Sequence, residues 1–189
     1  MTFRPTFPTD FNLIRKVMVR EIIKVTGLDP SSVVVTEPET QNEPRPALPY
    51  FGMKILVPGA KFGDDSKQYV SGTVWNSGGV RTMTISFDCY GNSHEEAYNY
   101  MALWQTSLDL ENVQADLRQY GIAVELIGTV ADLSALLNTG YEGRAHLDCT
   151  FHIAMNLTSD LGAEESVEVQ GAVDTNSGIV NTDVTVGPI

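Results

Sequence analysis

Residues 144–157 read RAHLDCTFHIAMNL, and their hydrophobic pattern has a period of two. Nearly every even-numbered position is polar, and every odd-numbered one is apolar: Ala145, Leu147, Cys149, Phe151, Ile153, Met155 and Leu157. Successive side chains of a β-strand point to opposite faces of its sheet. The pattern therefore predicts a long strand with one buried face and one polar face.

A second alternating run precedes this strand. Residues 82–89 read TMTISFDC and place Met83, Ile85, Phe87 and Cys89 on one face. Shorter strands are predicted at residues 33–35, 50–57 and 122–127, where apolar residues cluster between turn signals. Together these segments predict a sheet.

Helical spacing appears in two places. Residues 11–26 carry apolar side chains close to a 3.6-residue period, with Thr9 or Asp10 as N-cap and Gly27 as the end. Ser93 and Glu96 form a capping box before a helix that should pack Trp104 on the sheet. We expect a further helix over 113–120 and another turn or two of helix over 132–137.

The remaining segments have loop-like compositions. Residues 36–49 contain four prolines and predict an extended, exposed connection. Residues 59–80 are rich in Gly, Ser and Asp, which favours a protruding hairpin or long loop. After residue 158, a weak alternation over 164–173 predicts a peripheral strand or arm, and 174–189 a tail.

The expected fold class is α/β (α+β): a twisted mixed or antiparallel sheet flanked by helices, with a protruding β-hairpin or loop and a C-terminal arm. We divide the 189 residues into an α/β domain over 1–158 and a C-terminal strand or arm with a flexible tail over 159–189.

Charge is distributed unevenly along the chain. The formal net charge is -12, yet residues 1–94 hold ten basic and nine acidic side chains. Residues 95–189 hold fifteen acidic side chains against two basic ones, Arg118 and Arg144. Such a half would repel phosphates, which excludes nucleic-acid binding by charge neutralisation. The charge fits either solubility or a surface that DNA passes without adhering.

Two cysteines, Cys89 and Cys149, fall on the apolar faces of predicted strands and are expected to be buried free thiols. The N-terminal residues lack a signal-peptide pattern, and no run approaches 18 apolar residues. We therefore expect a protein made and kept in a reducing, soluble compartment, without membrane contact.

Patterns that carry chemistry are scarce. His146, Asp148 and His152 share the polar face of the long strand, but the two histidines would lie roughly 20 Å apart at about 3.3 Å per residue. One metal ion cannot bridge that distance. A third histidine, His94, stands beside a helix start.

Two further segments resemble functional motifs only in part. Residues 59–63, GAKFG, lack the spacing of a phosphate-binding loop and read as a surface turn. Glu95 and Glu96 complement a helix N-terminus. The sequence thus assigns no catalytic, cofactor-binding or metal-binding residue and no cofactor, and we do not expect an enzyme, although a site assembled from distant loops stays open.

Three separated segments resemble one known family. They are QNEPRPALPY at 41–50, TISFDCYG at 84–91 opening a helix, and YEGRAHLD at 141–148. Their order and spacing, with the Trp104 helix between them, are similar to the neck or tail terminator proteins of tailed bacteriophages. The resemblance covers about residues 10–158.

This resemblance implies a virion structural protein, made in the cytoplasm of a bacterial host, that assembles as a homo-oligomer, a hexameric ring. The ring would end the tail tube, joining connector or adaptor proteins above to tail tube or sheath protein below, while genomic DNA passes through without specific binding. Segment 59–80 and the C-terminal tail could add strands to a neighbour. The alternatives are another connector, an adaptor or a tube protein, or a small soluble enzyme.

Overall fold

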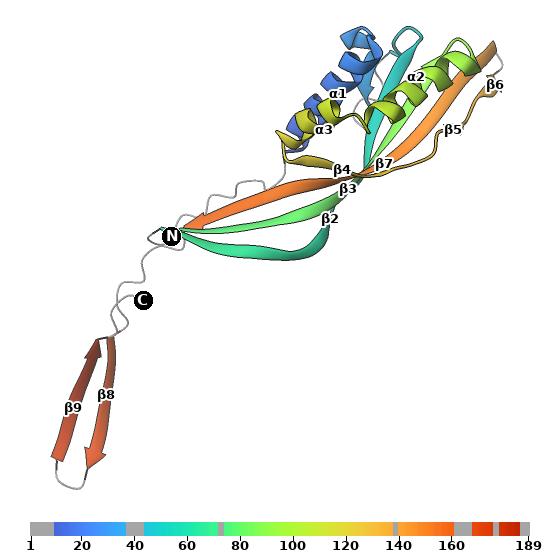
Figure 1. Ribbon diagram of the computed structural model, residues 1–189. Helices are drawn as coiled ribbons and strands as arrows, with labels where there is room; N and C mark the ends of the chain where they lie inside the picture. The colour runs from blue at the N-terminus through green and yellow to red at the C-terminus, as the bar shows by residue number, and fades with distance from the viewer. Residues whose placement is uncertain are drawn as a thin grey trace.

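A computed structural model describes residues 10–36, 44–71, 74–137, 140–160, 168–175 and 178–185. Within these residues the main sheet has seven strands (Figure 1). Its main path is β1–β2–β3–β7–β4, and β5 and β6 also pair with β7. The strands are β1 (Val33–Val35), β2 (Tyr50–Ser71), β3 (Val74–Gly91), β4 (Ile122–Ile127), β5 (Ala131–Asp132), β6 (Ala135–Leu137) and β7 (Gly140–Asp160).

The sheet is mixed, as expected. The β1 strand pairs with β2 in parallel, whereas all other neighbours are antiparallel. The pairing of β3 with β7 runs without a register shift from Val74↔Asp160 to Gly91↔Gly143. The long alternating strand predicted at 144–157 is β7, which pairs with β3 on one side and with β4, β5 and β6 on the other.

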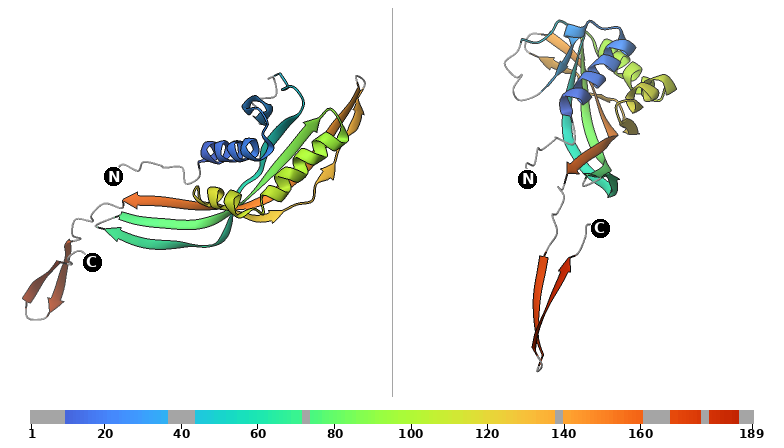
Figure 2. Two further views of the ribbon diagram at one scale, coloured as in Figure 1. Left: turned by 45° about the horizontal axis from the view of Figure 1, so that its top comes forward. Right: turned by 90° about the vertical axis from the view of Figure 1, so that its left-hand side faces the viewer.

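Three helices lie on one face of the sheet (Figures 1 and 2): α1 (Phe11–Thr26), α2 (His94–Ser107) and α3 (Glu111–Arg118), with a short 3-10 turn, η1 (Pro30–Ser32), after α1. The side chain of Asp10 caps α1 by accepting from the Leu13 N–H at 3.1 Å, and Gly27 ends it at φ 70°. Ser93 Oγ accepts from the Glu96 N–H at 3.1 Å. Both predicted helix starts are confirmed.

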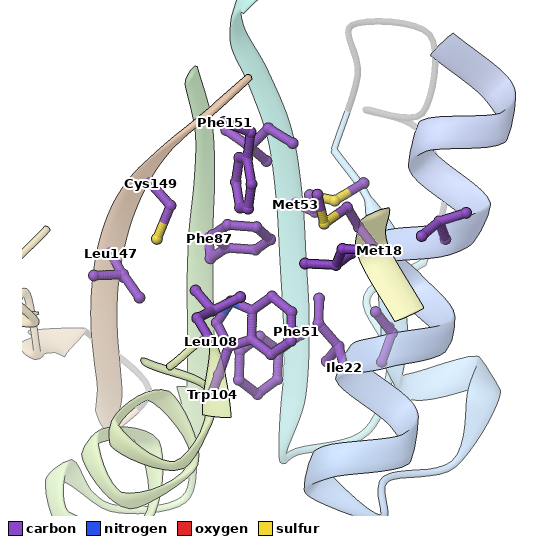
Figure 3. Close-up of a cluster of buried hydrophobic side chains, with 14 of the residues drawn as sticks. Met18, Ile22, Phe51, Met53, Phe87, Trp104, Leu108, Leu147, Cys149 and Phe151 are labelled. Atoms are coloured by element: carbon purple, nitrogen blue, oxygen red, sulfur yellow. The ribbon is translucent and has the colours of Figure 1, made fainter. Parts of the chain in front are cut away.

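The core lies between this face and the helices (Figure 3). Trp104 of α2 is fully buried and meets the Phe87 ring edge to face, with centroids 5.4 Å apart. From α1, Met18 and Ile22 pack toward Phe51 of β2. Burial of this apolar surface is the main favourable term that holds the helices on the sheet.

The sheet extends beyond its helices. We call Val57–Ser71 of β2, Val74–Thr82 of β3 and Ala154–Asp160 of β7 the distal sheet, and the helix-covered remainder the proximal sheet. Every described side chain of the distal sheet is at least partly exposed. Figure 1 shows these three strands running past the helices to the end at which β7 terminates.

The structure corrects three expectations. Residues 132–137, predicted as helix, contribute to β5 and β6, because their backbone pairs with the start of β7, as in Ala135↔Glu142. The strands predicted at 50–57 and 82–89 are longer than expected: β2 continues to Ser71 and β3 begins at Val74, and their antiparallel pairing has the hairpin form expected of residues 59–80. Tertiary pairing decides β-structure more than local propensity does.

The third correction concerns the C-terminus. Residues 178–185, predicted as tail, form β9 (Gly178–Thr185), which pairs antiparallel with β8 (Glu168–Thr175). Residues 37–43, within the predicted proline-rich connection, lie outside the described residues, as do 186–189. Among the described helices, none is long and apolar enough to span a bilayer.

Candidate assembly surfaces

The helix-free face of the proximal sheet carries an ordered polar cluster centred on Asp88. One carboxylate oxygen, Oδ1, accepts hydrogen bonds from Nε and Nη2 of Arg144 at 3.2 and 3.0 Å. The same oxygen lies 3.0 Å from Nδ1 of His146, whose Nε2 lies 3.3 Å from Asp148 Oδ1. These groups sit on adjacent strands because Asp88 and His146 are register partners. The cluster links β3 to β7 across the exposed face.

Aromatic rings extend this cluster toward β2. Tyr50 and Tyr90 stack with centroids 4.6 Å apart, and the Arg144 guanidinium carbon lies 5.3 Å from the Tyr90 ring centroid. Burial raises the pKa of Tyr50 to about 12, and burial also raises the pKa of Tyr90. Both phenols therefore stay neutral at physiological pH. Because Tyr50 is only 6% exposed, the stacked, neutral pair supports the Arg144 side chain of the polar face from within the sheet.

The three segments that carried the family resemblance meet at this cluster. Tyr50 ends the first segment, Asp88 belongs to the second and Arg144 to the third. From the first segment, Arg45 also donates to Glu142 Oε2 in the third at 3.3 Å. Spacing along the chain did not reveal this convergence, since strand order alone brings β2, β3 and β7 together.

Two glycines allow α2 to begin directly above these strands. Gly91 and Gly143 are register partners in β3 and β7. A Cβ at Gly143 would lie 2.1 Å from the Ser93 carbonyl oxygen, and one at Gly91 would lie 2.8 Å from the Ala97 nitrogen. Neither position can hold a side chain without displacing the helix start, which explains why glycine stands in both motifs.

The histidines do not converge. As predicted, His146 and His152 lie on one sheet face, but His152 Nε2 approaches Glu125 at 3.6 Å, and its ring lies 4.7 Å from that of Phe62. His94 Nδ1 lies 3.1 Å from Asp132. Hydrogen bonds from the hydroxyl and N–H of Ser134, with a smaller contribution from His94, lower the pKa of Asp132. No group of three metal-ligating side chains occurs among the described residues.

The distal sheet exposes aromatic side chains. Phe62 and Tyr69 are each 54% exposed and Trp75 is 42% exposed. The rings of Tyr69 and Trp75 meet edge to face with centroids 5.6 Å apart. Exposed aromatic groups on ordered strands are typical of contact surfaces between proteins.

The lysine-containing segment 59–63 lies within β2. Gly59 has φ 136° and Gly63 φ 68°, and the register with β3 shifts between Val57 and Ala60 and between Phe62 and Ser66. The predicted surface turn is therefore an irregular, bulged part of a strand. Nζ of Lys61 lies 3.8 Å from Asp65, which is also bound by Arg81 through two hydrogen bonds of 2.7 and 2.9 Å.

The acidic start of α2 has the structural role that its sequence predicts. Glu96 accepts from the Asn92 N–H at 2.7 Å. A shallow hollow beside it is lined only by Ser93 and α2 residues, namely Glu95, Glu96, Asn99, Tyr100 and Leu103. Among the described residues, no second element brings a side chain into this hollow, and its lining gives no convergent set of groups.

The basic helix α1 is partly neutralised within the chain. Its Glu21 is fully buried, although sequence periodicity did not single it out, and pairs with Arg20 at 2.8 Å and Lys24 at 3.5 Å. Lys24 also contacts Asp116 of α3. Hydrogen bonding to Asp116 raises the pKa of Lys24, so the ion pair persists at neutral pH. Part of the positive charge of α1, in the near-neutral half of the sequence, is therefore paired inside one subunit with a carboxylate of the acidic half.

These features define a class of protein. The described residues assemble no convergent chemical site, yet they present an ordered polar face and an exposed aromatic sheet extension. Such surfaces are those of an assembly subunit.

The comparison with protein families agrees. The phage neck terminator protein family matches residues 12–183, and the chain belongs to this family. It is thus a structural protein of the phage neck and a component of the virion, associated with other neck and tail proteins. The match extends beyond residue 158, where the resemblance seen in the sequence ended, and includes β8 and most of β9. No curated protein matches the chain.

Proposed function

We propose that six copies of this protein form a closed ring that ends the tail tube and joins it to the head-tail connector. The observation that carries the proposal is the uncovered sheet of a neck terminator: helices protect only one face, and the distal sheet has no described cover. A sheet exposing Phe62, Tyr69 and Trp75 is best explained by neighbours that cover it.

Ring closure requires two unlike surfaces on each subunit. In a cyclic assembly, one surface of a subunit contacts a different surface of the next. The proximal cluster around Asp88 and the distal sheet lie at different parts of one sheet and differ in chemistry: the first is ionic, whereas the second carries exposed aromatic rings beside the Arg81–Asp65 ion pair. The proximal cluster and the distal sheet supply the two unlike surfaces, and the two ends of the ring would then meet the tail tube and the connector.

The excess of acidic residues suits a channel for DNA. Exposed carboxylates such as Glu95, Asp109 and Glu111 belong to the half of the sequence that carries almost all the negative charge. We infer that the assembled channel repels phosphates, so that genomic DNA passes without adhering. Any attraction to the wall would slow its passage.

Imaging combined with light scattering tests the ring. Purified protein, alone and with tail tube protein, should show a particle of about six subunit masses with a central opening in negative stain. The same particle should not retain duplex DNA at low salt in a filter-binding assay. A strict monomer at high concentration, with and without tube protein, would overturn the ring, and tight DNA retention would overturn the repelling channel.

A further inference from the structure

The far end of β7 has an open edge. The β7 strand pairs with β3 from Gly143 to Asp160, but β4 covers its other side only as far as Ile122↔Ile153. The last contact on that side is the Ala154 N–H, which donates to the Gly121 carbonyl at 2.8 Å. Beyond it, no described strand pairs with residues 155–160 on that side.

The orientation of the backbone makes this edge available. Residues along a strand direct their N–H and C=O groups alternately to its two sides. Because Ala154 donates toward β4, the main-chain groups of Asn156 and Thr158 also point away from β3. Hence β7 presents a short row of outward donors and acceptors.

The opposite edge of the distal sheet differs. Past Met53, where its pairing with β1 ends, β2 carries Pro58 together with Lys54, Lys61 and Lys67. Its register with β3 shifts four times. Bulges, lysines and prolines are the usual protection of sheet edges against unwanted pairing. Residues 155–160 contain no lysine, proline or glycine, and their register with β3 is unbroken.

A strand pair without a further partner follows in the same chain. Strands β8 and β9 pair with each other and with no other described strand. An isolated two-stranded hairpin is only marginally stable in water. Each strand has eight residues, enough to cover the β7 edge, and the family match includes β8 and most of β9. The hairpin is thus part of what the family shares.

We propose that the outer edge of β7 at 155–160 accepts the β8–β9 hairpin of a neighbouring copy through main-chain hydrogen bonds. This inference rests on the proposed ring and names one of its contacts. Each subunit would donate its hairpin to the next subunit and accept one from the previous subunit, which is the head-to-tail contact that closes a ring. The regular β7 edge is the acceptor because the bulged β2 edge resists pairing.

A proline on the edge tests the acceptor. Thr158→Pro removes an outward N–H without removing a bond to β3, a position at which edge strands tolerate proline. We expect the variant to keep the circular dichroism spectrum and melting temperature of the monomer but to lose at least tenfold in ring formation. The matched control, Thr158→Val, keeps the N–H and should assemble like the wild type. Normal rings from Thr158→Pro would overturn this contact while leaving the ring itself intact.

Disulfide trapping tests the donor. The native thiols do not interfere, because Cys89 and Cys149 are 0% and 1% exposed. Chains with Thr158→Cys are mixed with size-tagged chains that carry a cysteine on the hairpin, either Ala172→Cys on β8 or Asn181→Cys at the paired position on β9. Mild oxidation should yield disulfide-linked heterodimers of one tagged and one untagged chain. Double-variant chains, Thr158→Cys/Ala172→Cys or Thr158→Cys/Asn181→Cys, test the alternative. If the disulfide forms only within such a chain, the hairpin lies on its own subunit, which would overturn the exchange of hairpins between subunits. Absence of any disulfide, in rings that otherwise form, would also overturn it, whereas absence of rings from the wild type would overturn both the ring and this contact.

Discussion

The proximal and distal parts of the sheet share three strands but differ in what surrounds them. In the proximal part, α1 and α2 cover one face, and Met83, Ile85 and Phe87 are fully buried. In the distal part the same strands continue without helices, and Trp75 is 42% exposed. The register of β2 with β3 is regular from Tyr50 to Ile55 and broken repeatedly after it.

This difference separates two roles within one sheet. The proximal part buries enough apolar surface to fold within a single chain. The distal part has ordered strands but no described core of its own. Its exposed apolar groups therefore contribute stability only when another surface covers them. One end of the sheet is therefore suited to stability and the other to assembly.

The two tryptophans provide the strongest test of this comparison. Trp104→Ala removes a fully buried ring that packs on Phe87 and should lower the free energy of unfolding by about 4 kcal/mol. Trp75→Ala removes mainly the edge-to-face contact with Tyr69 and should cost about 1 kcal/mol. Urea unfolding followed by circular dichroism measures both values. Equal losses would show that the distal sheet belongs to the same core and would break the distinction.

A smaller, pH-dependent effect is expected at Asp65, in the distal sheet. Its hydrogen bonds from Arg81 lower the pKa of this carboxyl below its ordinary value of 3.8. A lowered pKa in the folded state means that the charged form favours folding, so the contribution is present above pH 3.8 and is lost as pH falls through the lowered pKa.

Thermal unfolding of Asp65→Asn checks this expectation. The wild type should melt a few degrees above the variant at pH 7, and the difference should be lost as pH falls below 3.8 and through the lowered pKa. The near-UV signal of the Tyr69–Trp75 pair reports on the distal sheet. Asp64→Asn, at the exposed neighbouring position, serves as control for the same change of residue type. If the difference in melting temperature between the wild type and Asp65→Asn persists in acid, the ion pair is not its cause.

The smallest expected effect concerns the thiols of the proximal core. Burial raises the pKa of Cys89 and Cys149 to about 12, so almost no thiolate exists at pH 8. Both thiols should resist an aromatic disulfide reagent in the folded protein, so the reagent should leave the free energy of unfolding unchanged. Both should react fully in urea. A Thr158→Cys thiol on the distal sheet should react at once. Fast reaction of either native thiol would show that the proximal core opens readily.

Much of the fold follows from local patterns. Alternation predicted β7 and the proximal end of β3, and helical spacing with Asp10, Gly27 and Ser93 predicted α1 and the start of α2. These predictions succeeded because one-sided burial imposes its period on the residues of any strand or helix. The family, too, was suggested by three short segments of sequence.

Other features depend on pairing between distant segments. Nothing local distinguishes β5 and β6 from a helical turn, and the composition of 59–80 leaves a hairpin and a loop open until strand pairing decides for the hairpin. Glu21 reads as one more charge on a basic helix, yet packing buries it between Arg20 and Lys24. Each case is settled by tertiary packing or strand pairing, which the local pattern of residue types does not encode.

The sequence by itself determined which residues face a core, where two helices begin and how unevenly charge is divided, because these properties depend on the residue types and their spacing. Only the tertiary structure decided that Tyr50, Asp88 and Arg144 meet on one face, and that the β7 edge is open while the β2 edge is protected. Strand order and register are set by contacts between remote segments, and no local period encodes them.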